Sequence, residues 1–241
     1  YKPQAGYTGA DTFGYTVSDG TDVASADVVL TVAQHLRSDD FSTGAIDPFW
    51  TLEGPNATAE ERVEGNEGFL ALAVPQGHYN AWTNNKAARL LQDTPDGDFT
   101  VEVKFLSEPS MDLQVQGIFV EEDADNWLRF DVYRNTTGLW IYSAAVVDGV
   151  ARKKIRVATE TGEASHLKVE HVGDTWIYST SPDGETWTIA GSFDLDLTVT
   201  AIGPFAAASG PGFEARIDYF ESAADPILAE DANNLPPVAV A

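Results

Sequence analysis

The chain of 241 residues contains no cysteine. It therefore has neither a disulfide framework nor a thiolate metal site, and it needs no oxidising compartment although it is compatible with one. Long hydrophobic runs are missing too: no apolar stretch approaches the roughly 18 residues of a membrane-spanning helix, so we expect no membrane insertion. The N-terminus shows no basic, apolar targeting signal, and since the sequence begins at Tyr1 we expect a piece of a longer protein.

Positive charge is scarce. Only 14 Lys and Arg stand against 38 Asp and Glu, which gives a formal net charge of -24. Nucleic acids and anionic membrane surfaces are bound through basic patches, so we expect neither as a partner. An excess of carboxylates repels itself in the compact state, so bound cations or high ionic strength should stabilise the fold. The charge suits a salty or calcium-rich medium, and it equally serves solubility alone.

Alternating apolar residues and dense turn signals are abundant, while helical periodicity is almost absent. The strand-like segments of the larger part of the chain are 69–74, 99–105, 113–121, 127–133, 139–146, 167–172, 176–181, 187–190 and 213–221. Asp183-Gly184, between Tyr178 and Trp187, is a strong signal for a short hairpin. So many short strands predict an all-β fold, an antiparallel jelly-roll β-sandwich, at residues 38–222.

Residues 1–34 alternate in hydrophobicity around a Ser-Asp-Gly turn, which predicts a β-hairpin. The string GYTGADTFGYTVSDG resembles the closing strands of cadherin-like and bacterial Ig-like repeats of large surface proteins, and the match covers the last third of such a repeat. The resemblance implies a small, partial Ig-like unit. A two-stranded ribbon is marginally stable alone, so we expect it to pack on the second domain or to borrow a strand.

Residues 223–241 are interpreted as an acidic, proline-containing linker followed by the first strand of a next repeat, Val238 to Val240. One hypothesis is that this tail completes the N-terminal hairpin by strand exchange, within one molecule or between neighbouring repeats or subunits. The alternative is a tail docked on the sandwich or in a crystal contact.

Six strings occur in the order SDDFSTGAIDPFW, EGNEGFLAL, DADNWLRFDVY, GDTWIYSTSPDGETWT, GPFAAASG and IDYFES. In order and spacing they resemble the concanavalin A-like, laminin G-like β-sandwich found at the C-terminus of β-xylosidases and in modules of extracellular bacterial proteins. The likeness covers residues 38–222. It implies an extracellular location, secreted or at the cell surface, and first and last strands that lie side by side.

The same resemblance implies a structural calcium ion on the convex side of the sandwich. Its ligands would be an Asp of the closing strand and carbonyl groups of the opening strand and of the turn before the Gly-x-Leu-x-Leu strand, which correspond to Asp218, the Asp40 region and Gly68. Hard oxygen ligands suit calcium, whereas zinc would favour His or Cys. The alternative is that Asp218 caps a strand end and Asp40 starts a strand, with water between them.

A catalytic carboxylate pair is not evident. A retaining glycanase needs two carboxylates about 5 Å apart on one strand face, and the nearest string, Glu121 to Asn126, falls in a turn between two strands. A Gly-x-Ser-x-Gly elbow and a His-Glu-x-x-His motif are absent, and the Gly203 to Gly212 stretch precedes no helix. We therefore expect no enzyme.

The segment from Gly77 to Gln92 is the candidate recognition surface. It places aromatic residues on a polar loop, and aromatics that stack on a pyranose beside amides and a guanidinium suit a sugar site. The strands at 113–121 and 127–133 have polar residues on one face. If that face is the concave surface, Gln116 and Arg129 line it beside Trp82. The predicted ligand-binding residues are His78, Tyr79, Trp82, Arg89, Gln92, Gln116 and Arg129. The alternative for Trp82 is a plug over the sandwich.

The sequence thus favours a non-catalytic carbohydrate-binding or adhesion module of a large secreted or cell-surface protein, stabilised by calcium, with a polysaccharide or other glycan as partner. A second hypothesis is a purely structural spacer repeat in a surface protein or extracellular filament. A degenerate glycan hydrolase is the least favoured. A glycan array separates the first two hypotheses, and release of reducing sugar would indicate the third.

Overall fold

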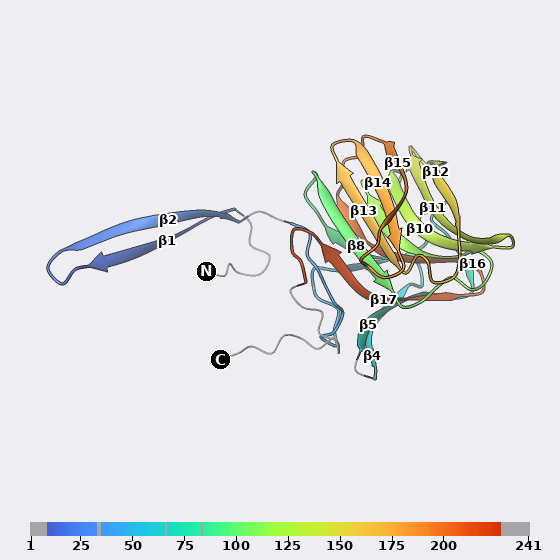
Figure 1. Ribbon diagram of the computed structural model, residues 1–241, viewed down its shortest axis with the longest axis horizontal. Helices are drawn as coiled ribbons and strands as arrows, with labels where there is room; N and C mark the ends of the chain where they lie inside the picture. Colours follow the sequence, from blue (N-terminus) through green and yellow to red (C-terminus); the bar gives the residue numbers. More distant parts are fainter. Residues whose placement is uncertain (1–8, 33–34, 66, 83, 228–241) are drawn as a thin grey trace. The chain divides into compact units, whose positions relative to one another are not determined.

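The computed structural model describes residues 9–32, 35–65, 67–82 and 84–227 (Figure 1). The chain divides into two compact units, Tyr1–His35 and Leu36–Ala241. The described residues contain strands and turns but no helix. The strand expected at Val238 to Val240 lies outside the described residues.

The first unit is a two-stranded antiparallel hairpin, as the alternation predicted. Strand β1 (Gly9–Ser18) pairs with β2 (Val23–Val32). The turn between them is held by Asp19, whose carboxylate accepts hydrogen bonds from the backbone amides of Thr21 and Asp22, both at 2.8 Å. Aromatic and aliphatic residues of this hairpin are exposed within the unit. Its assignment to a cadherin-like or Ig-like repeat stays a prediction.

The second unit is a sandwich of two antiparallel sheets, which confirms the predicted fold class. The eight-stranded sheet has the order β12-β11-β10-β9-β16-β7-β3, with β6 paired to β16. Its strands are β3 (Thr51–Glu53), β6 (Gly77–Tyr79), β7 (Ala88–Asp93), β9 (Gln114–Glu121), β10 (Trp127–Asn135), β11 (Gly138–Val147), β12 (Val150–Thr159) and β16 (Ala201–Gly210).

The seven-stranded sheet has the order β15-β14-β13-β8-β17-β5-β4. Its strands are β4 (Thr58–Glu64), β5 (Glu67–Val74), β8 (Phe99–Phe105), β13 (His166–Val172), β14 (Thr175–Ser181), β15 (Thr188–Asp194) and β17 (Phe213–Ser222). The last two strands of the unit, β16 and β17, lie inside the two sheets between strands from earlier in the chain, so neither sheet can form from one continuous segment.

The main core lies between the two sheets because successive side chains of a strand point to opposite faces. In β10, Leu128, Phe130 and Val132 point inward and are fully or almost fully buried. Trp176 and Tyr178 of β14 meet them from the other sheet, with ring centroids 5.8 and 5.5 Å from that of Phe130. Burial of each such side chain stabilises the fold by about 1.5–3 kcal/mol.

The opening segment lies beside the closing strand, as expected. The backbone amide of Asp39 donates to the carbonyl of Phe220 at 2.9 Å, and the amide of Phe220 donates back to Asp39 at 2.9 Å. Trp50 packs edge-on against Phe220, and its indole Nε1 donates to the Asp39 carboxylate at 2.8 Å. The first and last segments of the sandwich therefore meet beside the Trp50 side chain.

A second apolar cluster covers the face of the eight-stranded sheet that is turned away from the core, which we call the outer face. Its buried members are Ala81, Ala87, Leu91, Val115, Phe119, Trp127, Val146, Phe205 and Ala207. The segment between β6 and β7 contributes Ala81 and Ala87 and so lies over part of this face. This face is therefore apolar although it is turned away from the main core.

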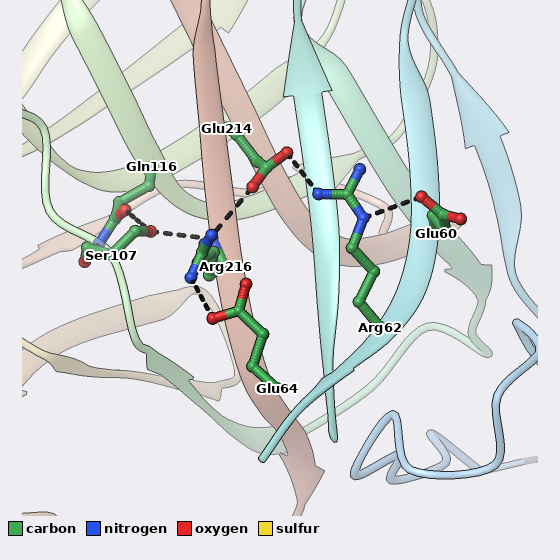
Figure 2. A network of polar contacts seen from close by, with 7 residues as sticks. All are labelled: Glu60, Arg62, Glu64, Ser107, Gln116, Glu214 and Arg216. Atoms are coloured by element: carbon green, nitrogen blue, oxygen red, sulfur yellow. Dashed lines mark hydrogen bonds and ion pairs between the residues drawn. The ribbon is translucent and has the colours of Figure 1, made fainter. Parts of the chain in front are cut away.

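The seven-stranded sheet has charged side chains on its exposed side instead (Figure 2). Arg62 of β4 contacts Glu60 at 2.8 Å and Glu214 of β17 at 2.9 Å. Arg216 of β17 contacts Glu214 at 3.4 Å and Glu64 of β4 at 2.9 Å. This row of ion pairs joins β4 to β17 across β5. Exposed pairs of this kind stabilise by about 0.2–1 kcal/mol each.

Candidate functional site

A pocket of about 330 Å³ opens on the outer face of the eight-stranded sheet. Its lining residues come from β9, β10, β11, β16, the residue before β9 and the loop after β6, and they are Asn80, Trp82, Leu113, Val115, Arg129, Tyr133, Tyr142, Ala207, Ala208 and Ser209. The small side chains of β16 leave room for the pocket, and aromatic rings border this room. The lining contains no Asp or Glu.

Three aromatic rings border the pocket. Tyr142 lies between the other two, with its ring centroid 5.2 Å from that of Tyr133 in an edge-on arrangement and 6.3 Å from that of Trp82. Burial raises the pKa of the Tyr142 phenol to about 12. The phenol is therefore neutral at physiological pH, so it can both donate and accept a hydrogen bond.

The loop that carries Trp82 is fixed by its own polar groups. The Asn80 side-chain oxygen accepts a hydrogen bond from the Trp82 amide at 3.0 Å, and the Asn80 carbonyl accepts one from the Lys86 amide at 3.1 Å. Next to it, the carbonyl of Ala81 accepts a hydrogen bond from the indole of Trp127 at 3.3 Å. An Asn side chain that caps its own turn in this way lowers the freedom of the loop. Trp82 is thus held partly exposed at the pocket.

A buried ion pair lies beneath the rings. Nε of Arg129 contacts Oδ2 of Asp131 at 2.7 Å and its Nη2 contacts Oδ1 at 2.9 Å, while the two residues are 6% and 0% exposed. The rings of Tyr142 and Phe205 lie 5.4 and 5.7 Å from the guanidinium carbon. Such a bidentate pair is strong and fixed in direction, so Arg129 presents its remaining edge to the pocket.

Burial and attraction act against each other in this pair. Burial raises the pKa of the Asp131 carboxyl, and the Arg129 guanidinium limits that rise. Burial also lowers the pKa of Arg129, but attraction to Asp131 outweighs it, so the pKa ends above its ordinary value.

Gly117 makes room for the pair. It lies opposite Asp131 on β10 and opposite Phe205 on β16. A Cβ atom at Gly117 would lie 2.2 Å from the Phe130 carbonyl oxygen and 2.6 Å from Cβ of Asp131. The missing side chain is thus a condition for placing a carboxylate at the centre of the sheet.

Trp82 and Arg129 are the two predicted ligand-binding residues that line the pocket. Arg89 also lies at the outer face, above the ring of Phe119 at 5.1 Å, but Glu53 and Glu121 engage its guanidinium at 2.5 and 3.5 Å. Arg89 is 5% exposed and is not part of the lining. It orders the neighbouring strands rather than the pocket.

The two predicted glutamines, Gln92 and Gln116, are not among the residues that line the pocket. The Gln92 side chain forms hydrogen bonds of 2.8 and 2.9 Å with the backbone of Arg37, and Gln116 forms two of 2.7 Å with Ser107 (Figure 2). Both point to the inner side of the sheet. Because alternate residues change face, Val115 and Gly117 are the β9 positions at the outer face.

His78 and Tyr79 do not line the pocket either. Tyr79 packs against the main core, and its hydroxyl accepts a hydrogen bond from the Asn56 amide at 3.0 Å. His78 is exposed and lies opposite Ser209, a lining residue, in the pairing of β6 with β16. Tyr79 lies opposite Ala208, another lining residue, so both residues flank the pocket without lining it.

Several lining residues escaped the sequence analysis. Tyr142 lies in the apolar string LWIYSAAVV, and its alternation with Ile141 and Ser143 was the available signal. Strand β16 was interpreted as a glycine-rich stretch, although its pattern of small apolar residues is that of a strand buried on both faces. Strand β12 contributes no residue to the lining, but the sequence analysis missed it too, because its charged residues are exposed at a sheet edge.

The residues predicted to bind calcium make the following contacts in the structure. The Asp218 carboxylate contacts the Lys104 ammonium at 2.6 Å, and a lysine in the ligand shell opposes a divalent cation. Asp40 accepts hydrogen bonds from the amide and hydroxyl of Ser42, at 3.2 and 2.6 Å, and Gly68 lies opposite Val63 in the pairing of β4 with β5. Within the described residues no cluster of three or more His, Cys, Asp or Glu is arranged to hold a metal. Calcium binding as such stays a prediction.

The described part of the chain contains no helix of the length and hydrophobicity that crossing a membrane requires.

The acidic turn between β9 and β10 is held by the Asp123 carboxylate, which accepts hydrogen bonds from the amide of Asp125 at 2.8 Å and the side chain of Asn126 at 2.9 Å. Its polar groups are therefore used within the turn.

Residues 75–224, which include the whole pocket, match the family described as "Protein of unknown function (DUF1349)". The chain belongs to the DUF1349 family. No curated protein sequence matches this DUF1349 chain.

Solved structures share the fold at low identity. A GH43 protein from Bacillus licheniformis is 19% identical with a TM-score of 0.65, and a xylan β-1,4-xylosidase from Bacillus halodurans is 17% identical with a TM-score of 0.61. In both cases the match covers 80% of this chain and only 40% of the other. A functionally unknown protein from Saccharomyces cerevisiae is 16% identical with a TM-score of 0.56, and 77% of this chain covers 97% of that one. These likenesses support a β-sandwich of the concanavalin A-like type.

Proposed function

We propose that this DUF1349 protein is a non-catalytic carbohydrate-binding or adhesion module of a secreted or cell-surface protein, and that the pocket at the outer face binds the glycan. The observation that carries the proposal is the aromatic pocket of about 330 Å³ above a buried Arg129–Asp131 pair. Its volume falls within the roughly 300–1,000 Å³ of small-ligand sites.

The chemistry of the lining suits a sugar. Aromatic faces stack on the C–H face of a pyranose, and Trp82 and Tyr142 supply two such faces on one side of the pocket. Asn80, Ser209 and Arg129 supply the polar groups that hydroxyl groups need. Because the loop and the guanidinium are held by internal hydrogen bonds, little order has to be created on binding.

The lining favours binding over hydrolysis. Glycoside hydrolysis commonly uses two carboxylates on either side of the scissile bond. The pocket has no carboxylate in its described lining, and the nearby Asp131 is fully buried and engaged by Arg129. A hydrolase would need at least one accessible acid here.

A glycan array with the purified protein tests the proposal. We expect binding to at least one polysaccharide, and we expect Tyr142→Ala or Trp82→Ala to weaken it about tenfold or more through loss of stacking. Trp187→Ala is the matched control, because Trp187 lies between β14 and β15 of the other sheet. Melting curves of all three variants check that the fold is intact.

Two results would contradict the proposal. Absence of any glycan binding would favour the structural spacer. Release of reducing sugar from a bound glycan would show a hydrolase instead.

A further inference from the structure

Arg156 lies beside the pocket and is held by two aromatic residues. It is directly opposite Tyr142 in the pairing of β12 with β11, so both side chains leave the same face of the sheet. Its guanidinium carbon lies 3.7 Å over the ring of Trp140, and its Nε donates to the Tyr133 hydroxyl at 3.0 Å. Trp140 in turn donates from its indole to the Asn135 side chain at 3.0 Å. An exposed arginine is thus oriented before a ligand binds.

Carboxylates pair with most arginines of this chain but not with Arg156. Six of the eight arginines form ion pairs with Asp or Glu, namely Arg37, Arg62, Arg89, Arg129, Arg134 and Arg216. Among the described residues, Arg156 has no carboxylate partner, and its Nη1–Nη2 edge has no hydrogen-bond acceptor. In a chain with 38 acidic and 14 basic residues, an oriented arginine without an acid indicates a ligand that supplies one.

The donors of the pocket point to the same kind of ligand. Asp131 engages Nε and Nη2 of Arg129, while Nη1 has no acceptor among the described residues. The Tyr133 hydroxyl accepts from Arg156, so its own proton is available to another acceptor. The lining holds no carboxylate that would compete. The site is therefore rich in donors and has few charged acceptors.

We propose that the bound glycan is acidic, and that the carboxylate of a uronic acid residue binds the Nη1–Nη2 edge of Arg156 while a sugar ring packs on Tyr142. This inference rests on the proposed glycan binding and names its ligand class. A guanidinium edge matches a carboxylate with two parallel hydrogen bonds. The net charge of -24 does not prevent this, because charges beyond about 8 Å are largely screened at physiological salt.

Matched pairs of oligosaccharides that differ only in the acid test the proposal. The probes are oligogalacturonate, glucuronic acid-substituted xylo-oligosaccharide and oligomannuronate, each against its own methyl ester and each titrated calorimetrically. We expect the wild type to bind the acidic member of at least one pair about tenfold or more tightly, a difference of about 1.4 kcal/mol.

Three variants locate the effect. Arg156→Ala should abolish the preference for the acid while affinity for the neutral member changes little. Arg156→Lys should restore part of the preference, because it keeps the charge but loses the planar edge. Arg152→Ala is the matched control, because Arg152 is exposed on the same strand and has no ion pair among the described residues.

Each contrary outcome has one meaning. If the wild type binds both members equally, and Tyr142→Ala weakens both, the acidic ligand is wrong and the glycan-binding function stands. If Arg156→Ala weakens both members to the same degree, Arg156 has a structural role only. If the wild type binds no probe and no glycan on the array, both proposals fall.

Discussion

The two sheets of this sandwich carry the same ion-pair chemistry on their outer sides in different surroundings. Arg62 and Glu214 on the seven-stranded sheet have side chains that are 42% and 32% exposed, whereas those of Arg129 and Asp131 on the eight-stranded sheet are 7% and 0% exposed. In the first case water can replace either partner at little cost. In the second, each charge depends on the other because the surrounding rings exclude water.

The comparison bears on the proposed glycan binding. A solvated row of charges, as in Figure 2, joins strands but presents no apolar surface to a ligand. The eight-stranded sheet carries apolar residues on both faces, and the charged pair is retained at the point where the aromatic cover opens into a pocket. Burying an ion pair costs desolvation energy, but the pair holds its guanidinium in one direction. A group fixed in this way beside an accessible pocket can orient a ligand.

The largest expected effect comes from breaking the buried pair. Asp131→Asn leaves the Arg129 charge buried without a partner, and we expect the free energy of unfolding to fall by about 3–5 kcal/mol. Chemical denaturation measures it. The double variant Arg129→Met with Asp131→Leu should cost less than Asp131→Asn alone. A loss under 1 kcal/mol for Asp131→Asn would remove the distinction between the two faces.

A buried carboxylate at the junction of the two chain ends sharpens the comparison. Burial raises the pKa of Asp39 to about 6, against hydrogen bonds from the Phe41 amide and the Trp50 indole that lower it. The folded state then holds the proton more tightly than the unfolded state, so Asp39 lowers the free energy of unfolding as pH rises from about 4 to about 6. Above pH 6 nearly the full penalty, on the order of 3 kcal/mol, is present.

Asp39→Asn should remove this contribution to the pH dependence. We expect the difference in unfolding free energy between pH 4.5 and pH 7.5 to change by about 2 kcal/mol relative to wild type, because part of the penalty is already present at pH 4.5. The lost hydrogen bond adds only an offset that is the same at both pH values. Trp50→Phe removes a hydrogen bond that lowers the pKa, so it should enlarge the difference. Parallel pH curves for wild type and Asp39→Asn would show that the Asp39 pKa is not raised.

The smallest expected effect comes from the exposed network. Glu214→Gln removes the shared acceptor of Arg62 and Arg216, and we expect a loss of no more than about 1 kcal/mol. The loss should shrink further at 1 M salt, where the screening length is about 3 Å. A larger, salt-independent loss would mean that this row of charges stabilises the fold as the buried pair does.

Most of the fold followed from local patterns. The alternation and turn signals placed the N-terminal hairpin and most strands of the sandwich, and the family resemblance implied that its first and last strands lie side by side. Strands β12 and β16 are among those that the patterns missed, and for different reasons. Strand β12 is charged because it lies at an edge, and β16 is apolar throughout because both its faces are covered.

The site was predictable only in part. Arg129 and Tyr133 share a face of β10 by alternation, and Trp82 stood out in a polar loop. Gln116 does not line the pocket, and the sequence did not indicate this because β9 is apolar on both sides, so its pattern does not say which face meets the core. Tyr142 and Arg156 join the site through strand pairing alone.

By itself, the sequence determined an all-β sandwich with an apolar core and decided which residues of each strand share a face, because side-chain direction repeats every two residues. Only the tertiary structure decided which face became the core, which strands became neighbours and which charges lost water. Strand pairing brings residues far apart in sequence together, and the cost of burying Arg129 with Asp131 exists only once the surrounding rings are in place.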